Sequence, residues 1–154
     1  MVALCISACG DSAPTLLVDV RTDYVPAAEF FEFEVSLVRA DGSLETQLRR
    51  AVSSDSVLSG VRVGEFELEP GPNRIQGRLL GASGARVAER TVLVTVVEGT
   101  QATPLVFTRG CEGVVCPTGD AAATQCLGGT CVVPDCTPEN PMACPDGCPN
   151  AGEC

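Results

Sequence analysis

Eight of the ten cysteines in this chain follow Arg109, and they restrict what the last part of the chain can become. These are Cys111, Cys116, Cys126, Cys131, Cys136, Cys144, Cys148 and Cys154. A segment this short, with few apolar side chains, cannot bury enough surface to fold alone, and cross-links are the usual remedy. We therefore expect residues 111–154 to form a small, loop-dominated module held by disulfides.

The spacing of these cysteines suggests how they pair, although many pairings are open to eight cysteines. The first four are symmetrically spaced, which suggests two interlaced bridges, and we expect the same arrangement of the last four. The predicted pairs are Cys111–Cys126, Cys116–Cys131, Cys136–Cys148 and Cys144–Cys154. Each bridge that closes a loop of about 15 residues contributes on the order of 3 kcal/mol to stability.

Zinc is the competing use of clustered cysteines, and the sequence disfavours it. The tail has no C-x2-C pair and the chain has no histidine, the two features most typical of zinc sites. The acidic residues of the tail lack the spacing of known calcium loops. We predict no metal site and no cofactor.

Before the cysteines, residues 15–108 show the alternation of half-buried β-strands. Phe31, Phe33, Val35 and Leu37 alternate with polar residues and form the clearest strand, which Asp41-Gly42 ends with a tight turn. Val61 and Val63 are out of phase with Phe66 and Leu68. We expect a β-bulge at Gly64 to return both pairs to the core.

Further along, Pro70-Gly71-Pro72-Asn73 is expected to be a turn. Residues 86–97 are apolar on both faces, which predicts a central strand covered on both sides. Residues 103–107 are expected to be a last short strand, where Pro104 suits a sheet edge. Seven or eight such strands predict an all-β fold, an antiparallel immunoglobulin-like β-sandwich followed by the disulfide-rich tail.

Charge and composition exclude several functions. Ten basic against twenty acidic residues give a net charge of −10, so we expect no nucleic-acid partner. The chain has no histidine, and its ten basic residues are all arginine, so the commonest general bases are missing. The loop serines Ser54, Ser56 and Ser83 have no base to activate them. We predict no catalytic residues and no enzymatic activity.

The start of the chain carries a short motif. Ile6-Ser7-Ala8-Cys9 resembles the recognition box of bacterial lipoproteins, in which an aliphatic residue and two small residues precede the cysteine that receives the lipid. The resemblance implies that Cys9 is lipidated and that residues 1–14 are a signal remnant and tether. Residues 1–5 lack the basic start and apolar length of a signal, so we expect the N-terminus to be truncated or misassigned.

The whole chain resembles cysteine-rich envelope lipoproteins of GC-rich Gram-negative bacteria, myxobacteria especially. The lipobox and the stretch from Cys111 to Cys131 carry the likeness, and the strand rhythm is similar to immunoglobulin-like and transthyretin-like sandwiches. This resemblance implies a lipid anchor in the bacterial cell envelope, on the outer membrane, and an unidentified envelope partner. It implies a location and no particular activity.

The function expected from these features is structural. We expect the sandwich to act as a spacer and the loops and tail to present a contact surface. One alternative is a disulfide-rich inhibitor or ligand-capture module, with residues 117–125 as the binding loop. Another is that this chain is the N-terminal part of a longer surface protein.

Overall fold

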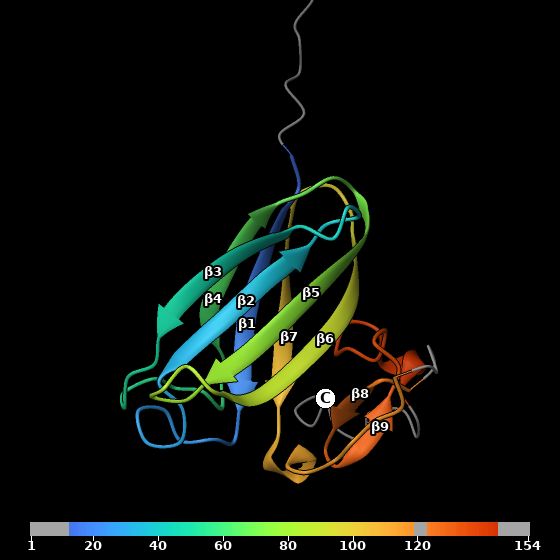
Figure 1. The fold of residues 1–154 in the computed structure, drawn as a ribbon. Helices are drawn as coiled ribbons and strands as arrows, with labels where there is room; N and C mark the ends of the chain where they lie inside the picture. Colours follow the sequence, from blue (N-terminus) through green and yellow to red (C-terminus); the bar gives the residue numbers. More distant parts are fainter. Residues whose placement is uncertain (1–12, 119–122, 145–154) are drawn as a thin grey trace, which may run out of the picture.

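Seven strands form a sandwich of two sheets, and the cysteine-rich tail packs against one side of it (Figure 1). The computed structural model describes residues 13–118 and 123–144. The larger sheet has the order β3-β2-β5-β6 and the smaller one the order β4-β1-β7. The strands are β1 (Thr15–Thr22), β2 (Glu32–Val38), β3 (Leu44–Arg50), β4 (Val61–Glu67), β5 (Gly71–Leu80), β6 (Arg86–Val96) and β7 (Thr100–Phe107). The all-β sandwich with a disulfide-rich tail is therefore confirmed.

The core lies between the sheets and follows the period of two in the sequence. In β1, Leu16, Val18 and Val20 are buried and alternate with half-buried residues. One aromatic was assigned to the wrong face: Phe31 precedes β2 and is exposed, whereas Phe30 is fully buried. Phe30 packs edge-to-face on Phe33 with ring centroids 4.9 Å apart. Within β2, Phe33, Val35 and Leu37 are buried as predicted, and only the position before the strand departs from the expected phase.

The predicted bulge at Gly64 is confirmed. The register between β1 and β4 shifts between Val18, which pairs with Gly64, and Asp19, which pairs with Arg62. The extra residue on β4 lets two out-of-phase pairs share the core. All four members are buried: Val61, Val63, Phe66 and Leu68.

Three expectations about the strands were wrong. The predicted turn at residues 70–73 is mostly strand, because β5 already begins at Gly71. Segment 86–96 is not central: β6 is the edge strand of its sheet, with one face buried and the other partly exposed, and the tail bonds to its edge. The sandwich is not wholly antiparallel, because β7 pairs in parallel with β1, from Thr15–Thr100 to Thr22–Phe107. As predicted, β7 lies at an edge.

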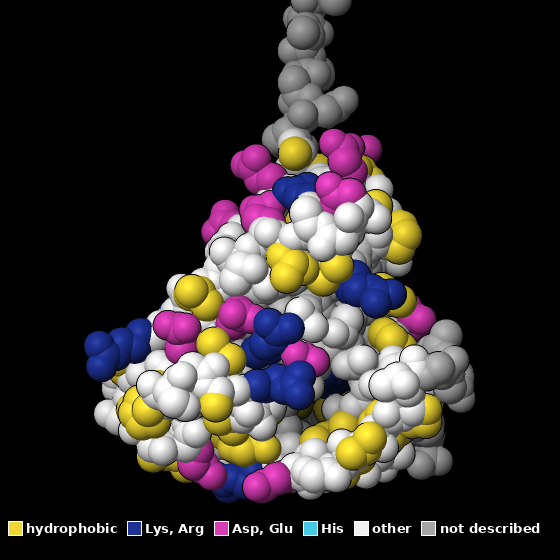
Figure 2. All heavy atoms as spheres, in the orientation of Figure 1, with side chains coloured by type: hydrophobic (Ala, Val, Ile, Leu, Met, Phe, Trp, Pro, Cys, Tyr) yellow, Lys and Arg dark blue, Asp and Glu magenta, His cyan; other side chains and the backbone are white. Residues whose placement is uncertain are grey.

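Charged side chains cross the outer face of the larger sheet. Arg78 of β5 binds Glu34 of β2 at 2.8 Å and Glu89 of β6 at 2.7 Å. Figure 2 shows basic, acidic and hydrophobic side chains mixed on this face, with no large patch of one charge. The face is therefore a solvated surface rather than a site for a polyanion.

The tail is a set of short elements joined by disulfides. The 3-10 turn η1 (Arg109–Cys111) leads to a hairpin of β8 (Gln125–Leu127) and β9 (Thr130–Val132), followed by η2 (Pro141–Ala143). Cys111–Cys126 and Cys116–Cys131 are bonded, which confirms the interlaced pairs. Each of these bridges spans 15 residues and joins the start of the tail to the hairpin.

The predicted pairs Cys136–Cys148 and Cys144–Cys154 were wrong, because Cys136 is bonded to Cys144. The intervening residues form two successive turns, in which Asn140 N–H donates to Thr137 O and Cys144 N–H donates to Pro141 O. These turns reverse the chain and bring the Cα atoms of the two cysteines to 4.7 Å. Cys148 and Cys154 lie outside the described residues.

Candidate functional site at the junction of sandwich and tail

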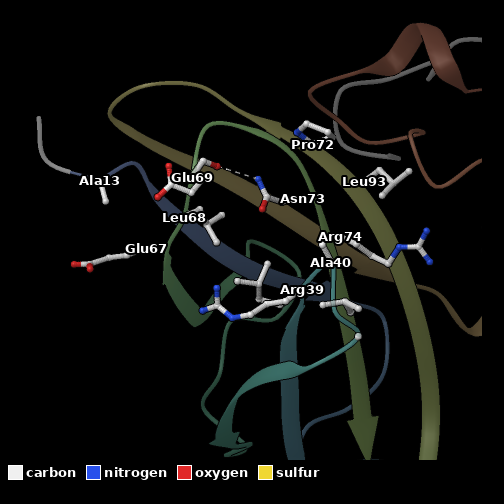
Figure 3. Close-up of a pocket in the computed structure, with 13 residues that line it drawn as sticks. Ala13, Arg39, Ala40, Glu67, Leu68, Glu69, Pro72, Asn73, Arg74 and Leu93 are labelled. Atoms are coloured by element: carbon white, nitrogen blue, oxygen red, sulfur yellow. Dashed lines mark hydrogen bonds between the residues drawn. The ribbon is translucent and has the colours of Figure 1, made fainter.

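One hollow lies at the end of the sandwich where the described chain starts (Figure 3). It has a volume of about 840 Å³ and is lined by Ala13, by residues of the β2–β3 hairpin and by the start of β5. Charges of both signs surround it, among them Arg39 and Glu69, and Asn73 Nδ2 already donates to backbone oxygens of Glu69 and Gly71. This mixture favours no ligand class.

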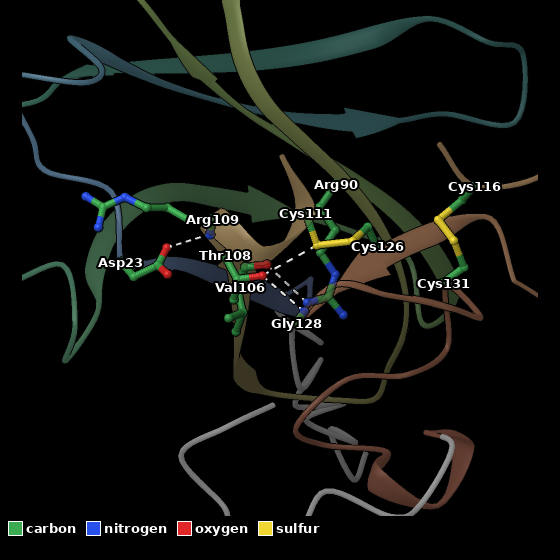
Figure 4. The surroundings of a disulfide bond; sticks show 10 residues. All are labelled: Asp23, Arg90, Val106, Thr108, Arg109, Cys111, Cys116, Cys126, Gly128 and Cys131. Carbon is green, nitrogen blue, oxygen red and sulfur yellow. Dashed lines mark hydrogen bonds between the residues drawn. A yellow bond between two sulfur atoms is a disulfide. The ribbon is translucent and has the colours of Figure 1, made fainter. Parts of the chain in front are cut away.

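The second hollow, of about 520 Å³, lies where the tail meets the sandwich. A buried cation stands beside it. Arg90 of β6 is only 2% exposed and donates to Val106 O of β7 at 3.1 Å (Figure 4). It also donates to Cys136 O of the tail at 2.8 Å. One side chain thus ties both sheets and the tail together, at the side where the sandwich would otherwise be open.

The environment of Arg90 explains its charge state. Burial lowers the pKa of Arg90 to about 10, and the negative charge of Glu139 opposes this shift. The guanidinium is therefore still a cation at neutral pH. Its Nε has no hydrogen-bond partner among the described residues. The strength of the clamp comes from the two carbonyl groups that the charged nitrogens satisfy.

The tail also covers the exposed edge of β6. Thr91 N–H donates to Gln125 Oε1 at 2.7 Å, and Leu93 N–H donates to Pro134 O at 3.0 Å. An uncovered strand edge invites pairing with other chains, so this contact protects the sheet. The tail therefore packs as part of the same folded unit as the sandwich.

Polar contacts fasten the beginning of the tail to the end of β7. Thr108 Oγ1 accepts a hydrogen bond from Gly128 N–H at 3.0 Å, and Arg109 N–H donates to Asp23 Oδ1 at 2.9 Å. The guanidinium of Arg109 pairs with Glu29, which lowers the pKa of that carboxyl. The first interlaced bridge is thus attached to the sandwich from both its ends, near Cys111 and near Cys126.

The tail also presents some apolar side chains outward. Val115 and Met142 are each 90% exposed, and Val114 is partly exposed at the rim of the junction hollow. Exposed apolar side chains on a disulfide-held loop are suited to contact with another protein. The tail surface is therefore the better candidate for binding.

The other predicted sites fare differently. Ser54, Ser56 and Ser83 are exposed in loops, and no group of three metal-ligating side chains occurs in residues 13–118 and 123–144. In the same residues no helix is long and apolar enough to cross a membrane. Cys9 lies outside the described residues, as do residues 119–122 of the proposed binding loop.

Sequence reasoning missed Arg90, although the sequence carried a signal. Arg90 begins the run of alternate residues whose later members, Val92, Val94 and Val96, are apolar and buried. An arginine in phase with such a run faces the core and needs carbonyl partners there. Its partners could not be named, because one of them lies in the tail.

Comparison with known proteins found no match: no protein family, curated protein or solved structure matches this chain.

Proposed function

We propose that this chain is a non-catalytic lipoprotein of the bacterial cell envelope, in which the sandwich is a spacer and the tail a contact surface. The observation that carries the proposal is the placement of the two ends. Ala13 lies at one end of the sandwich, whereas η1 and the β8–β9 hairpin lie at the other (Figure 1). An anchor at Cys9 would therefore hold the tail away from the membrane.

Two further features support this proposal. The three disulfides within the described part of the tail fit an oxidising compartment such as the periplasm or the cell surface. The Arg90 clamp and the bonds to the β6 edge hold the tail in one orientation. A contact surface fixed in this way loses little conformational entropy on binding.

The anchor is tested with two matched variants, because the N-terminal segment contains two cysteines. Cys9→Ser is expected to move the protein from the membrane to the soluble fraction and to remove the acyl mass from the N-terminus. Cys5→Ser is the control and should leave the protein in the membrane. Equal membrane association of both variants would refute the anchor.

The orientation is tested with the same anchored protein. A fluorescent amino acid is placed either at position 69, near Ala13, or at position 142 in the tail, and the lipid carries a quencher. The label at 69 should be quenched more strongly than the label at 142. Equal quenching would mean that the sandwich lies flat on the membrane and does not act as a spacer.

A further inference from the structure

The two sheets have four edge strands, and in three of them backbone groups bond to partners outside their own sheet. On β4, the side-chain amide of Gln47 accepts from Glu65 N–H at 3.1 Å and donates to Glu65 O at 2.5 Å. The tail covers the edge of β6, and Arg90 binds the carbonyl of Val106 on β7. The fourth edge strand is β3, and in the described residues its backbone bonds only to β2.

The register shows which β3 groups are unused. Ala51 N–H donates to Phe31 O and Arg39 N–H donates to Ser43 O, so odd-numbered residues of this segment face β2. The N–H and C=O groups of the even-numbered residues therefore point away from the sheet. These residues are Leu44, Thr46, Leu48 and Arg50.

The side chains of β3 alternate between the two faces of the sheet. Leu44 and Leu48 are 52% and 58% exposed and share the outer face of the sheet. Glu45 and Arg49, on the opposite face, carry opposite charges two residues on either side of Gln47, and within the chain they pair with Arg39 and Asp55. The strand is thus self-complementary about Gln47: when it is laid antiparallel on itself, each Glu45 lies across from an Arg49.

We propose that β3 is a self-association edge, where a second copy of this chain pairs antiparallel through a two-fold axis at Gln47. In this register Thr46 of each copy lies across from Leu48 of the other, and both are residues with free backbone groups. The pairing joins two four-stranded sheets into one. It also brings the leucines at 44 and 48 of both copies together on the outer face.

The geometry restricts where such pairs can form. The β2–β3 hairpin lies beside Ala13, so antiparallel pairing puts the Ala13 ends of the two copies at opposite ends of the dimer. Copies anchored by short tethers in one membrane would not meet in this way, whereas copies on two facing membranes would. The inference itself does not depend on the anchor.

The test is sedimentation of the full chain in oxidising buffer. Cys5 and Cys9 are replaced by serine so that no intermolecular disulfide forms. We expect a monomer–dimer equilibrium between about 1 µM and about 1 mM, a range that covers weak association. Hydrogen exchange should show protection of the Thr46 and Leu48 amides that increases with protein concentration.

Matched variants separate this edge from other contacts. Leu48→Lys should weaken the dimer at least about tenfold, because it brings like charges together at the two-fold axis. Glu45→Arg should weaken it too, by placing Arg across from Arg49. Leu58→Lys is the control, since Leu58 is 78% exposed in the loop before β4. A monomer at every concentration, or a dimer equally affected by Leu48→Lys and Leu58→Lys, would overturn the proposal.

Discussion

A side chain at position 77 should crowd the core, although the backbone conformation of Gly77 does not require glycine. It faces the core from the middle of β5, where a Cβ atom would lie 2.6 Å from Leu105 Cδ1 and 3.0 Å from Phe107 Cζ of the opposite sheet. Carbon atoms in contact prefer about 3.5–4.0 Å. The substitution Gly77→Ala therefore requires β7 side chains to move by about 1 Å.

The magnitude follows from two opposing terms. Overpacking of a core costs about 1–3 kcal/mol. Replacing glycine by alanine restricts the unfolded chain and returns about 0.4–1 kcal/mol. We expect Gly77→Ala to lower the free energy of unfolding by about 1–2 kcal/mol.

Urea unfolding followed by far-ultraviolet circular dichroism measures this change, with the disulfides intact. The control is Gly81→Ala directly after β5, where a Cβ would meet only Ala85 O at 3.5 Å and Val87 Cγ2 at 3.7 Å. In a Leu105→Ala background, Gly77→Ala should become less harmful by about 1 kcal/mol or more. Equal stability of the two glycine variants, or strictly additive effects with Leu105→Ala, would refute this account of sheet packing.

Three further substitutions test other contacts. Hydrogen bonds from Arg49 lower the pKa of Asp55 below its usual 3.8, so their contribution is present above that pH and lost as the pH falls through the lowered pKa. Thermal unfolding should show Asp55→Asn destabilised by about 1 kcal/mol at neutral pH, with the deficit closing in acid. Gln47→Leu should speed amide exchange at Glu65 and cost about 1 kcal/mol, because both backbone groups of Glu65 lose their partner. Gly129→Ala should loosen the tail more than Gly128→Ala. Gly129 has φ +85°, and a Cβ there would lie 3.2 Å from Gly110 O. Amide hydrogen exchange, measured with the disulfides intact, compares the two variants.

Local patterns predicted much of the fold. The period-two alternation identified the strands, and the phase change across Gly64 identified the bulge, because both are set by side chains within one strand. The interlaced bridges of Cys111 and Cys116 followed from symmetric spacing. The last cysteines did not, since the turns between Cys136 and Cys144 set that pairing.

Long-range contacts were beyond such patterns. The sequence of residues 86–97 does not distinguish a central strand from an edge strand whose edge bonds to a distant tail, so the prediction of a central strand was wrong. The bonds that decide the matter come from Gln125 and Pro134, far along the chain. The candidate site at Arg90 was hidden for the same reason, because it exists only after the tail has docked.

The parallel pair of β1 and β7 has a consequence for the order of folding. β1 is the middle strand of its sheet, and one of its two neighbours is the last strand of the sandwich. A chain made from its N-terminus has β1 first, yet that strand cannot complete its pairing until Phe107 has been added. Such distant pairing slows folding, because a long loop must close before the contact forms. The first strand, β1, therefore waits longest for its second pairing partner. The chain is most exposed to misassembly just before β7 has been added.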